Sequence, residues 1–256
     1  MQIIHATHAA ESGHWYKADG SPAYEIIAKN GDPRPTTLRD ARKLGLYPSV
    51  TTITRMAASP GLELWKQQQV LLAALTLPKI DLESEDAYLA RILADSREQA
   101  KKAMEKGTAI HAAIQGQYEG KRASDDMLAH VVGACDAVKA AFGVKLWTAE
   151  RSFADTAGYG GKVDLSCEGF VIDFKTKEFS ADKLPKGWDE QAMQLAAYRV
   201  GLGMPAADCA NVFVSTTVPG LSHVFAWNQA DLAKGWECFK ALLAYHQAKT
   251  GYRPQP

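Results

Sequence analysis

The sequence predicts an α/β fold in which helices flank one central mixed β-sheet, with a helical elaboration at the N-terminal end. Two observations indicate this fold class. From Ser96 onward the spacing of apolar residues follows the order helix, helix, three strands, helix, two strands, helix. A hydrophobic fraction of 46% over 256 residues supplies a full core, and no repeat divides the chain. We therefore expect one domain over residues 1–256, with 1–95 as the elaboration and 96–256 as the core.

The N-terminal residues predict a hairpin followed by two helices. Aromatic-rich arms surround Asp19 and Gly20, a strong turn signal, so we expect a hairpin and loop over 13–35 in which 30–35 is the loop. The stretch "YPSVTTITRMAASPG" predicts a short helix. An amphipathic helix over 61–77 follows, and a proline ends it.

The predicted core opens with two helices. Ser96 and Gln99 match an S-x-x-Q capping box, so we expect the first helix to begin at Ser96 and to end near Gly120. The second helix is expected over about 125–142. The rest of the core is predicted as strands at 146–154, 161–167 and 170–176, a helix at 189–203, a hairpin at 210–227 and a last helix from Asn228 to about Lys249.

Composition limits the class of protein. The formal net charge is zero, so no global field attracts a polyanion, and only a local basic surface could bind one. The four cysteines contain no CxxC pair, which predicts free thiols in a reducing compartment and neither a cysteine-bound zinc site nor an iron–sulfur cluster. The N-terminal stretch has no basic start and no long apolar run, so we expect no secretory signal, no membrane association and a cytoplasmic protein.

Two acids and a lysine fall on the second and third predicted core strands. Asp173 and Lys175 share a strand face, and a turn at 167–169 would bring Asp164 beside Asp173. Two close carboxylates repel, and a divalent cation relieves the repulsion; oxygen ligands favour Mg²⁺ or Mn²⁺. Lys175 could then orient a water nucleophile and offset charge on a phosphate. The alternative is a surface ion pair between Asp173 and Lys175.

Three other residues accompany this group. Gln194 and Tyr198 lie at i and i+4 on one face of the following helix, where the alternative is a solvated glutamine and a packed tyrosine. His111 lies in the first core helix near the Gly107 face and is expected to point inward. A lone inward histidine is alternatively a hydrogen-bonded core residue.

These residues form four motifs in order: Gly-x-x-x-His at 107–111, Gly-x-Val-Asp at 161–164, Asp-x-Lys-Thr at 173–176 and Gln-x-x-x-Tyr at 194–198. Together they resemble the RecB-like branch of the PD-(D/E)XK nucleases. The stretches "YPSVTTI" and "LELWKQQQ" also resemble the upstream region of the group that contains the mitochondrial genome maintenance exonucleases and their phage and bacterial relatives. The resemblance implies a restriction-endonuclease-like core and a bacterial or phage origin.

The resemblance also implies roles for these residues. His111, Asp164 and Asp173 would be metal ligands, together with the main-chain carbonyl of Phe174, and Lys175 would be the catalytic lysine. The auxiliary positions around them would contact DNA or hold the site in place: Gln194, Tyr198, Thr176, Lys177 and, as an outer acid or a structural residue, Glu150. The implied cofactor is Mg²⁺ or Mn²⁺, and the clustered cysteines of iron–sulfur members are absent.

The function expected from the resemblance is a metal-dependent DNA nuclease, most simply an exonuclease on single-stranded or end-processed DNA in replication, recombination or repair. Several lysines around the predicted sheet site are compatible with DNA: Lys162, Lys177, Lys183 and Lys186. Trp65 on the 61–77 helix could stack on a base, or simply pack that helix onto the core. The alternatives are a structure-selective endonuclease, a non-cleaving DNA-binding module and a small-molecule enzyme. For the last, the glycines at 158–161 precede a strand and make a poor phosphate nest.

Overall fold

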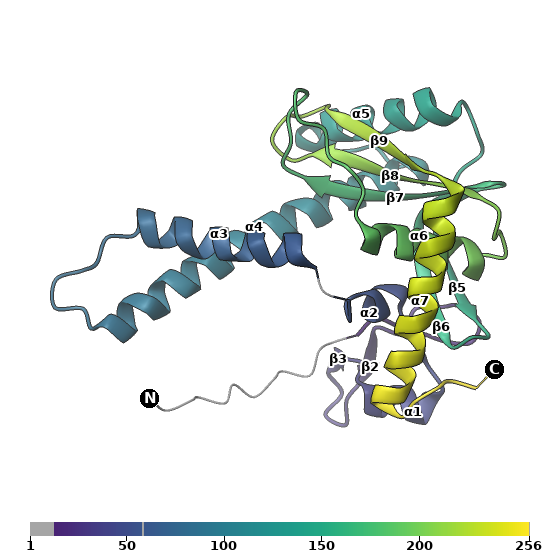
Figure 1. Ribbon diagram of the computed structural model, residues 1–256, viewed down its shortest axis with the longest axis horizontal. Helices are drawn as coiled ribbons and strands as arrows, with labels where there is room; N and C mark the ends of the chain where they lie inside the picture. The colour runs from purple at the N-terminus through teal and green to yellow at the C-terminus, as the bar shows by residue number, and fades with distance from the viewer. Residues whose placement is uncertain (1–12, 58, 256) are drawn as a thin grey trace.

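The protein is built around a five-stranded mixed β-sheet, described by a computed structural model that covers residues 13–57 and 59–255 (Figure 1). The strand order follows the chain: β5 (Thr148–Asp155), β6 (Tyr159–Cys167), β7 (Phe170–Lys177), β8 (Asp208–Ser215) and β9 (Ser222–Trp227). β7 and β8 are parallel and the other neighbours are antiparallel. The predicted α/β class and mixed sheet are confirmed.

Helices cover both faces of the sheet and divide the core in two. α4 (Glu85–Tyr118) and α5 (Asp125–Phe142) pack on one face, where Ile110, Ile172 and Phe174 are buried together. α6 (Asp189–Gly201) and α7 (Gln229–Thr250) cover the other face, where Val171 and Leu195 are buried. Alternate residues of β7 therefore face different cores, as the strand period requires.

The N-terminal part packs below the sheet beside α7 (Figure 1). It contains four short strands and two short helices before the long α3: β1 (Trp15–Tyr16), β2 (Glu25–Ile27), β3 (Pro33–Pro35), α1 (Leu38–Leu44), β4 (Tyr47–Pro48), α2 (Val50–Thr54) and α3 (Pro60–Thr76). The predicted hairpin over 13–35 is confirmed in part. The turn forms with Gly20 at φ 82°, and Tyr16 and Pro22 bridge antiparallel across it, while β1 also pairs with β4. Residues 33–35, expected in a loop, form β3, which pairs with β2.

The first core helix begins earlier than its sequence predicts. α4 starts after Ser84, whose side chain accepts a hydrogen bond from the amide of Ala87. Ser96 lies inside the helix and its hydroxyl donates to the carbonyl of Leu93, 3.0 Å away, so it caps nothing. The expected boundary at residue 96 thus falls within one continuous helix. The first half of α4 pairs with α3 as an arm that projects from the sheet (Figure 1).

The four cysteines are free thiols, and Cys238 is exposed while Cys209 is buried. No helix within the described part of the chain is long and apolar enough to cross a membrane.

Candidate functional site

The site lies where β6 and β7 separate. Their pairing runs from Cys167 opposite Phe170 to Leu165 opposite Ile172 and stops immediately before the two aspartates. The Asp164 carboxylate accepts a hydrogen bond of 2.8 Å from the main-chain amide of Phe174. Because the N–H and C=O of one strand residue point to the same side, the Phe174 carbonyl also faces the gap. A carboxylate and a main-chain carbonyl therefore meet between the separated strands.

A local twist of β6 directs Asp164 into this gap. Val163 packs in the core beneath α6 and Leu165 in the core beneath α4, although residues two apart in a regular strand share a face. The β5–β6 register places Glu150 opposite Asp164, and Glu150 adopts φ 55°, which is uncommon for a residue with a side chain. Glu150 forms an ion pair with Lys162. Glu150, expected as an outer acid or a structural residue, thus lies beside Asp164, and the charge of Lys162 neutralises it.

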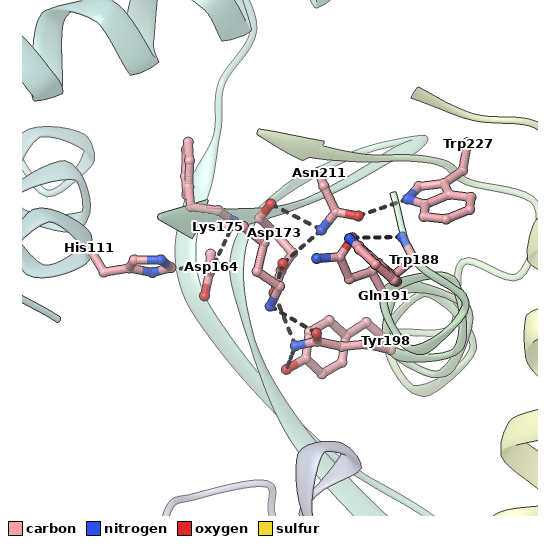
Figure 2. Close-up of polar contacts among 11 residues, drawn as sticks. His111, Asp164, Asp173, Lys175, Trp188, Gln191, Tyr198, Asn211 and Trp227 are labelled. Atoms are coloured by element: carbon pink, nitrogen blue, oxygen red, sulfur yellow. Dashed lines mark hydrogen bonds and ion pairs between the residues drawn. The ribbon is translucent and has the colours of Figure 1, made fainter. Parts of the chain in front are cut away.

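His111 reaches Asp164 because α4 approaches β7 closely. A Cβ atom added to Gly107 would lie 2.6 Å from the Thr176 hydroxyl, so only glycine allows this approach. One helical turn later, His111 places Nδ1 3.7 Å from Oδ2 of Asp164, with its ring edge-on to Phe174 (Figure 2). The Gly-x-x-x-His spacing therefore has a packing cause as well as a chemical one.

Asp173 is buried in a network that uses both of its carboxylate oxygens. Oδ2 accepts a 2.8 Å hydrogen bond from Asn211 Nδ2 and a 2.8 Å ion pair from Lys175. Oδ1 accepts a 3.0 Å hydrogen bond from Gln194. Asn211 is itself held by the indole N–H of Trp227, which donates to its side-chain oxygen over 2.8 Å (Figure 2). Asp173 is therefore fixed from β8, β9 and α6 together.

Gln194 connects the acid, the lysine and the tyrosine. Its amide nitrogen donates to Asp173 and, over 2.9 Å, to the hydroxyl of Tyr198, while its oxygen accepts from Lys175 over 3.0 Å. Tyr198 is only 5% exposed, and a side chain on Gly161 would collide with it, since an added Cβ would lie 2.9 Å from its ring. These contacts place Gln194 and Tyr198 as residues that hold the site in position.

Burial and charge set the protonation of the site. Burial, followed by the nearby Asp173, raises the pKa of Asp164 well above its ordinary value of 3.8. Burial lowers the pKa of His111, which keeps its imidazole neutral near pH 7. Burial alone would lower the pKa of Lys175, but Asp173 and Asp164 outweigh it and raise the pKa above 10.5. In this state Lys175 is an ammonium ion and not a base.

The two residues expected to contact DNA lie in different surroundings. Thr176 faces α4 against Gly107, on the sheet face opposite Lys175. Lys177 is exposed at the end of β7, with Nζ 5.7 Å from the centroid of the Trp188 ring. Trp65, the aromatic suggested for stacking, is half-buried on α3.

Sequence reasoning missed Asn211, Trp227 and Trp188. Asn211 is fully buried within the apolar run of β8, and a polar residue in such a run signals a buried partner. Trp188 directly precedes α6 and is 45% exposed, an unusual position for an indole. Motif spacing in the sequence shows neither the role of Asn211 nor that of Trp188, because both roles depend on which strands and loops are neighbours in the fold.

The donors suit a hard divalent cation better than a soft one. Across residues 13–57 and 59–255, no three histidine, cysteine or carboxylate side chains gather as a preformed metal cage. The groups that face the gap are the Asp164 carboxylate, the Phe174 carbonyl and the neutral His111, with Asp173 behind them. Oxygen donors of this kind fit Mg²⁺ or Mn²⁺, and a cation would offset the burial and the Asp173 charge that raise the pKa of Asp164.

Comparison with known proteins adds little. No family model and no curated protein matches the chain significantly. Among solved structures it is similar to the one described as "Crystal structure of SSO0001", with 15% sequence identity and a TM-score of 0.26, over 71% of this chain and 85% of that chain. A similarity at that TM-score carries no argument about fold or function.

Proposed function

We propose that this chain is a Mg²⁺- or Mn²⁺-dependent DNA nuclease of the PD-(D/E)XK type, with a restriction-endonuclease-like core. The observation that carries the proposal is the meeting of His111, Asp164, Asp173 and Lys175 at the separation of β6 and β7. His111 and Lys175 are 64 positions apart in the sequence and still meet there, as the four motifs predict. A chance D-x-K triplet would not recruit a histidine from α4 and a glutamine from α6.

The cation would be held by His111, Asp164, Asp173 and the Phe174 carbonyl, and when bound it would supply positive charge at the scissile phosphate and activate a water nucleophile. The protein's own residues prepare this site. The Phe174 amide fixes the Asp164 carboxylate, and Asn211 fixes that of Asp173. The depressed pKa of His111 keeps a nitrogen lone pair available near neutral pH.

Lys175 can stabilise negative charge as an ammonium ion and, once deprotonated, can act as a base. Its ammonium group lies 2.8 Å from Asp173 and can offset charge that develops on a phosphate. Gln194 holds the lysine at that position, and Tyr198 supports Gln194 from the buried side. Lys175 can act as a base only after it loses its own proton. A cation held by the same carboxylates would favour that loss, because it would lower the pKa of Lys175.

We further propose exonuclease action on single-stranded DNA or on free ends, from the resemblance to the genome maintenance exonucleases. The α3–α4 arm supports confinement of a strand, because α3 starts beside the site. The hydroxyl of Ser59, just before α3, donates to Glu190 of α6 over 3.0 Å. The arm therefore extends from the rim of the site (Figure 1).

A non-cleaving DNA-binding module is the second candidate, and one observation favours it. Oδ2 of Asp173 already accepts from Asn211 and Lys175, while Oδ1 accepts from Gln194 alone, so a cation that binds through Oδ2 must displace Lys175. A site that never exchanges this ion pair would bind DNA without hydrolysing it.

The test is incubation with linear and closed circular DNA, single- and double-stranded, with Mg²⁺ or Mn²⁺ and with each end labelled in turn. We expect degradation of linear single strands from an end and survival of the closed circle. Comparable degradation of the circle would establish an endonuclease. No metal-dependent cleavage of any substrate would overturn the nuclease and leave the binding module.

A further inference from the structure

The connection between β7 and α6 forms a pocket directly beyond Lys175. Its volume is about 560 Å³, and Lys177, Lys183, Lys186 and Trp188 are among the residues that line it. Lys177 ends β7 and lies about 7 Å beyond Lys175 by the rise of two strand residues. A chain that passes the candidate active site along β7 would therefore enter this pocket next.

Trp188 is held in place while much of its surface stays accessible. The indole is 45% exposed, and Lys177 Nζ lies 5.7 Å from its ring centroid. The start of α3 fits against the indole edge, since a Cβ added to Gly61 would lie 2.8 Å from Cη2 of Trp188. The main-chain amide of Trp188 donates to Gln191 over 3.0 Å. The Gln191 side chain thus closes the start of α6, and no side-chain hydrogen bond of Trp188 caps the helix.

The residues that line the pocket carry a net positive charge, in a chain of zero net charge. Three lysines and Glu178 line it, which gives 3 − 1 = +2. An accessible aromatic ring offers a stacking surface to any base, and ammonium groups neutralise phosphates. A duplex keeps its bases stacked on one another, so the ring suits an unpaired base.

We infer that this pocket is a subsite for single-stranded nucleic acid, in which one base stacks on Trp188 while Lys177, Lys183 and Lys186 contact the flanking phosphates. The inference deepens the proposed function and rests on it for the identity of the strand as DNA. Trp188, and not Trp65, is then the aromatic residue that selects unpaired strands. The subsite lies outside the group that would perform hydrolysis, so binding here can be measured without cleavage.

The experiment compares two fluorescent oligomers of equal length and charge, an oligothymidylate and its abasic counterpart, by anisotropy in EDTA. Wild type is expected to bind the oligothymidylate more tightly. Trp188→Leu should weaken that binding at least about fivefold and leave abasic binding unchanged, because stacking is lost and the phosphate contacts remain. Trp188→Phe should restore most of the preference. Tyr245→Leu is the matched control, since Tyr245 is 54% exposed with Lys249 Nζ 5.8 Å from its ring centroid.

The phosphate contacts are tested with Lys183→Gln together with Lys186→Gln. This change should weaken both oligomers alike and reduce the slope of log affinity against log salt by about 0.7 for each lost contact. The inference is overturned if wild type shows no preference for the oligothymidylate, or if Trp188→Leu binds as wild type does. Because the assay contains no divalent cation, a protein that never cleaves DNA can still support the inference, and an active nuclease can still refute it.

Discussion

Gly107→Ala tests whether the close approach of α4 to β7 builds the site. The added Cβ would lie 2.6 Å from the Thr176 hydroxyl, whereas ordinary contacts keep at least 3.4 Å, so the helix or the threonine must move. Overpacking of this kind costs roughly 1–3 kcal/mol. The alanine recovers about 1 kcal/mol of helix propensity, so the net change in the free energy of unfolding is a loss of up to about 2 kcal/mol.

Gly116→Ala on the same helix is the matched control. Its added Cβ would lie 3.6 Å from the Lys121 side chain, an ordinary contact, so only the propensity gain remains. Urea unfolding in EDTA should therefore separate the two variants by roughly 1–3 kcal/mol. Gly107→Ala with Thr176→Ala should recover most of the loss, because the nearest remaining contact is 3.7 Å. Equal stability of the two glycine variants would refute the packing explanation of the Gly-x-x-x-His motif.

Three further predictions concern the charges and the network. Without metal, the raised pKa of Asp164 makes the folded protein keep a proton that the unfolded chain loses above about pH 4. The free energy of unfolding of wild type relative to Asp164→Asn should therefore fall as pH rises from about 4 to about 8, and urea titrations of both proteins at several pH values measure this difference. Lys175→Ala should abolish cleavage of end-labelled DNA, while Lys177→Ala should keep the rate at saturating DNA and lose roughly one phosphate contact from the salt dependence; equal losses of rate would contradict this division. Asn211→Leu should lower stability by about 1–3 kcal/mol for each polar group left unpaired, measured by thermal unfolding, and unchanged stability would show that its bond to Trp227 carries no weight.

Most of the secondary structure could be predicted because apolar periodicity reports burial on one face. The helix over 125–142 is confirmed, and the three consecutive core strands agree with β5, β6 and β7 to within two residues. The start of a helix is harder to predict from local sequence than its existence. The S-x-x-Q at Ser96 is a true capping pattern that the buried interior of α4 overrides, and the real cap, Ser84, lies twelve residues earlier.

The grouping of acids, lysine and glutamine could be predicted from strand alternation and motif order, but the state of Asp173 could not. Repulsion between Asp164 and Asp173 suggests that removing either acid stabilises the metal-free protein. The structure supports stabilisation on removal of Asp164 alone, because the Asp173 carboxylate accepts hydrogen bonds from Asn211 and Gln194 and pairs with the charge of Lys175. Asp173→Asn would place an amide N–H₂ against donors and should destabilise the fold. Such contacts depend on β8 and α6, which no local pattern in the sequence connects to β7.

A divalent cation is proposed to bind in the gap between β6 and β7, and a titration with Mn²⁺ measures that binding. The measurement is the loss of the free-ion electron paramagnetic resonance signal when Mn²⁺ is titrated with DNA-free protein at slightly alkaline pH, where Asp164 more readily releases its proton. Wild type and Lys177→Ala are expected to bind Mn²⁺ equally, and Asp164→Asn is expected to lose binding. No binding by wild type, or undiminished binding by Asp164→Asn, would contradict the account.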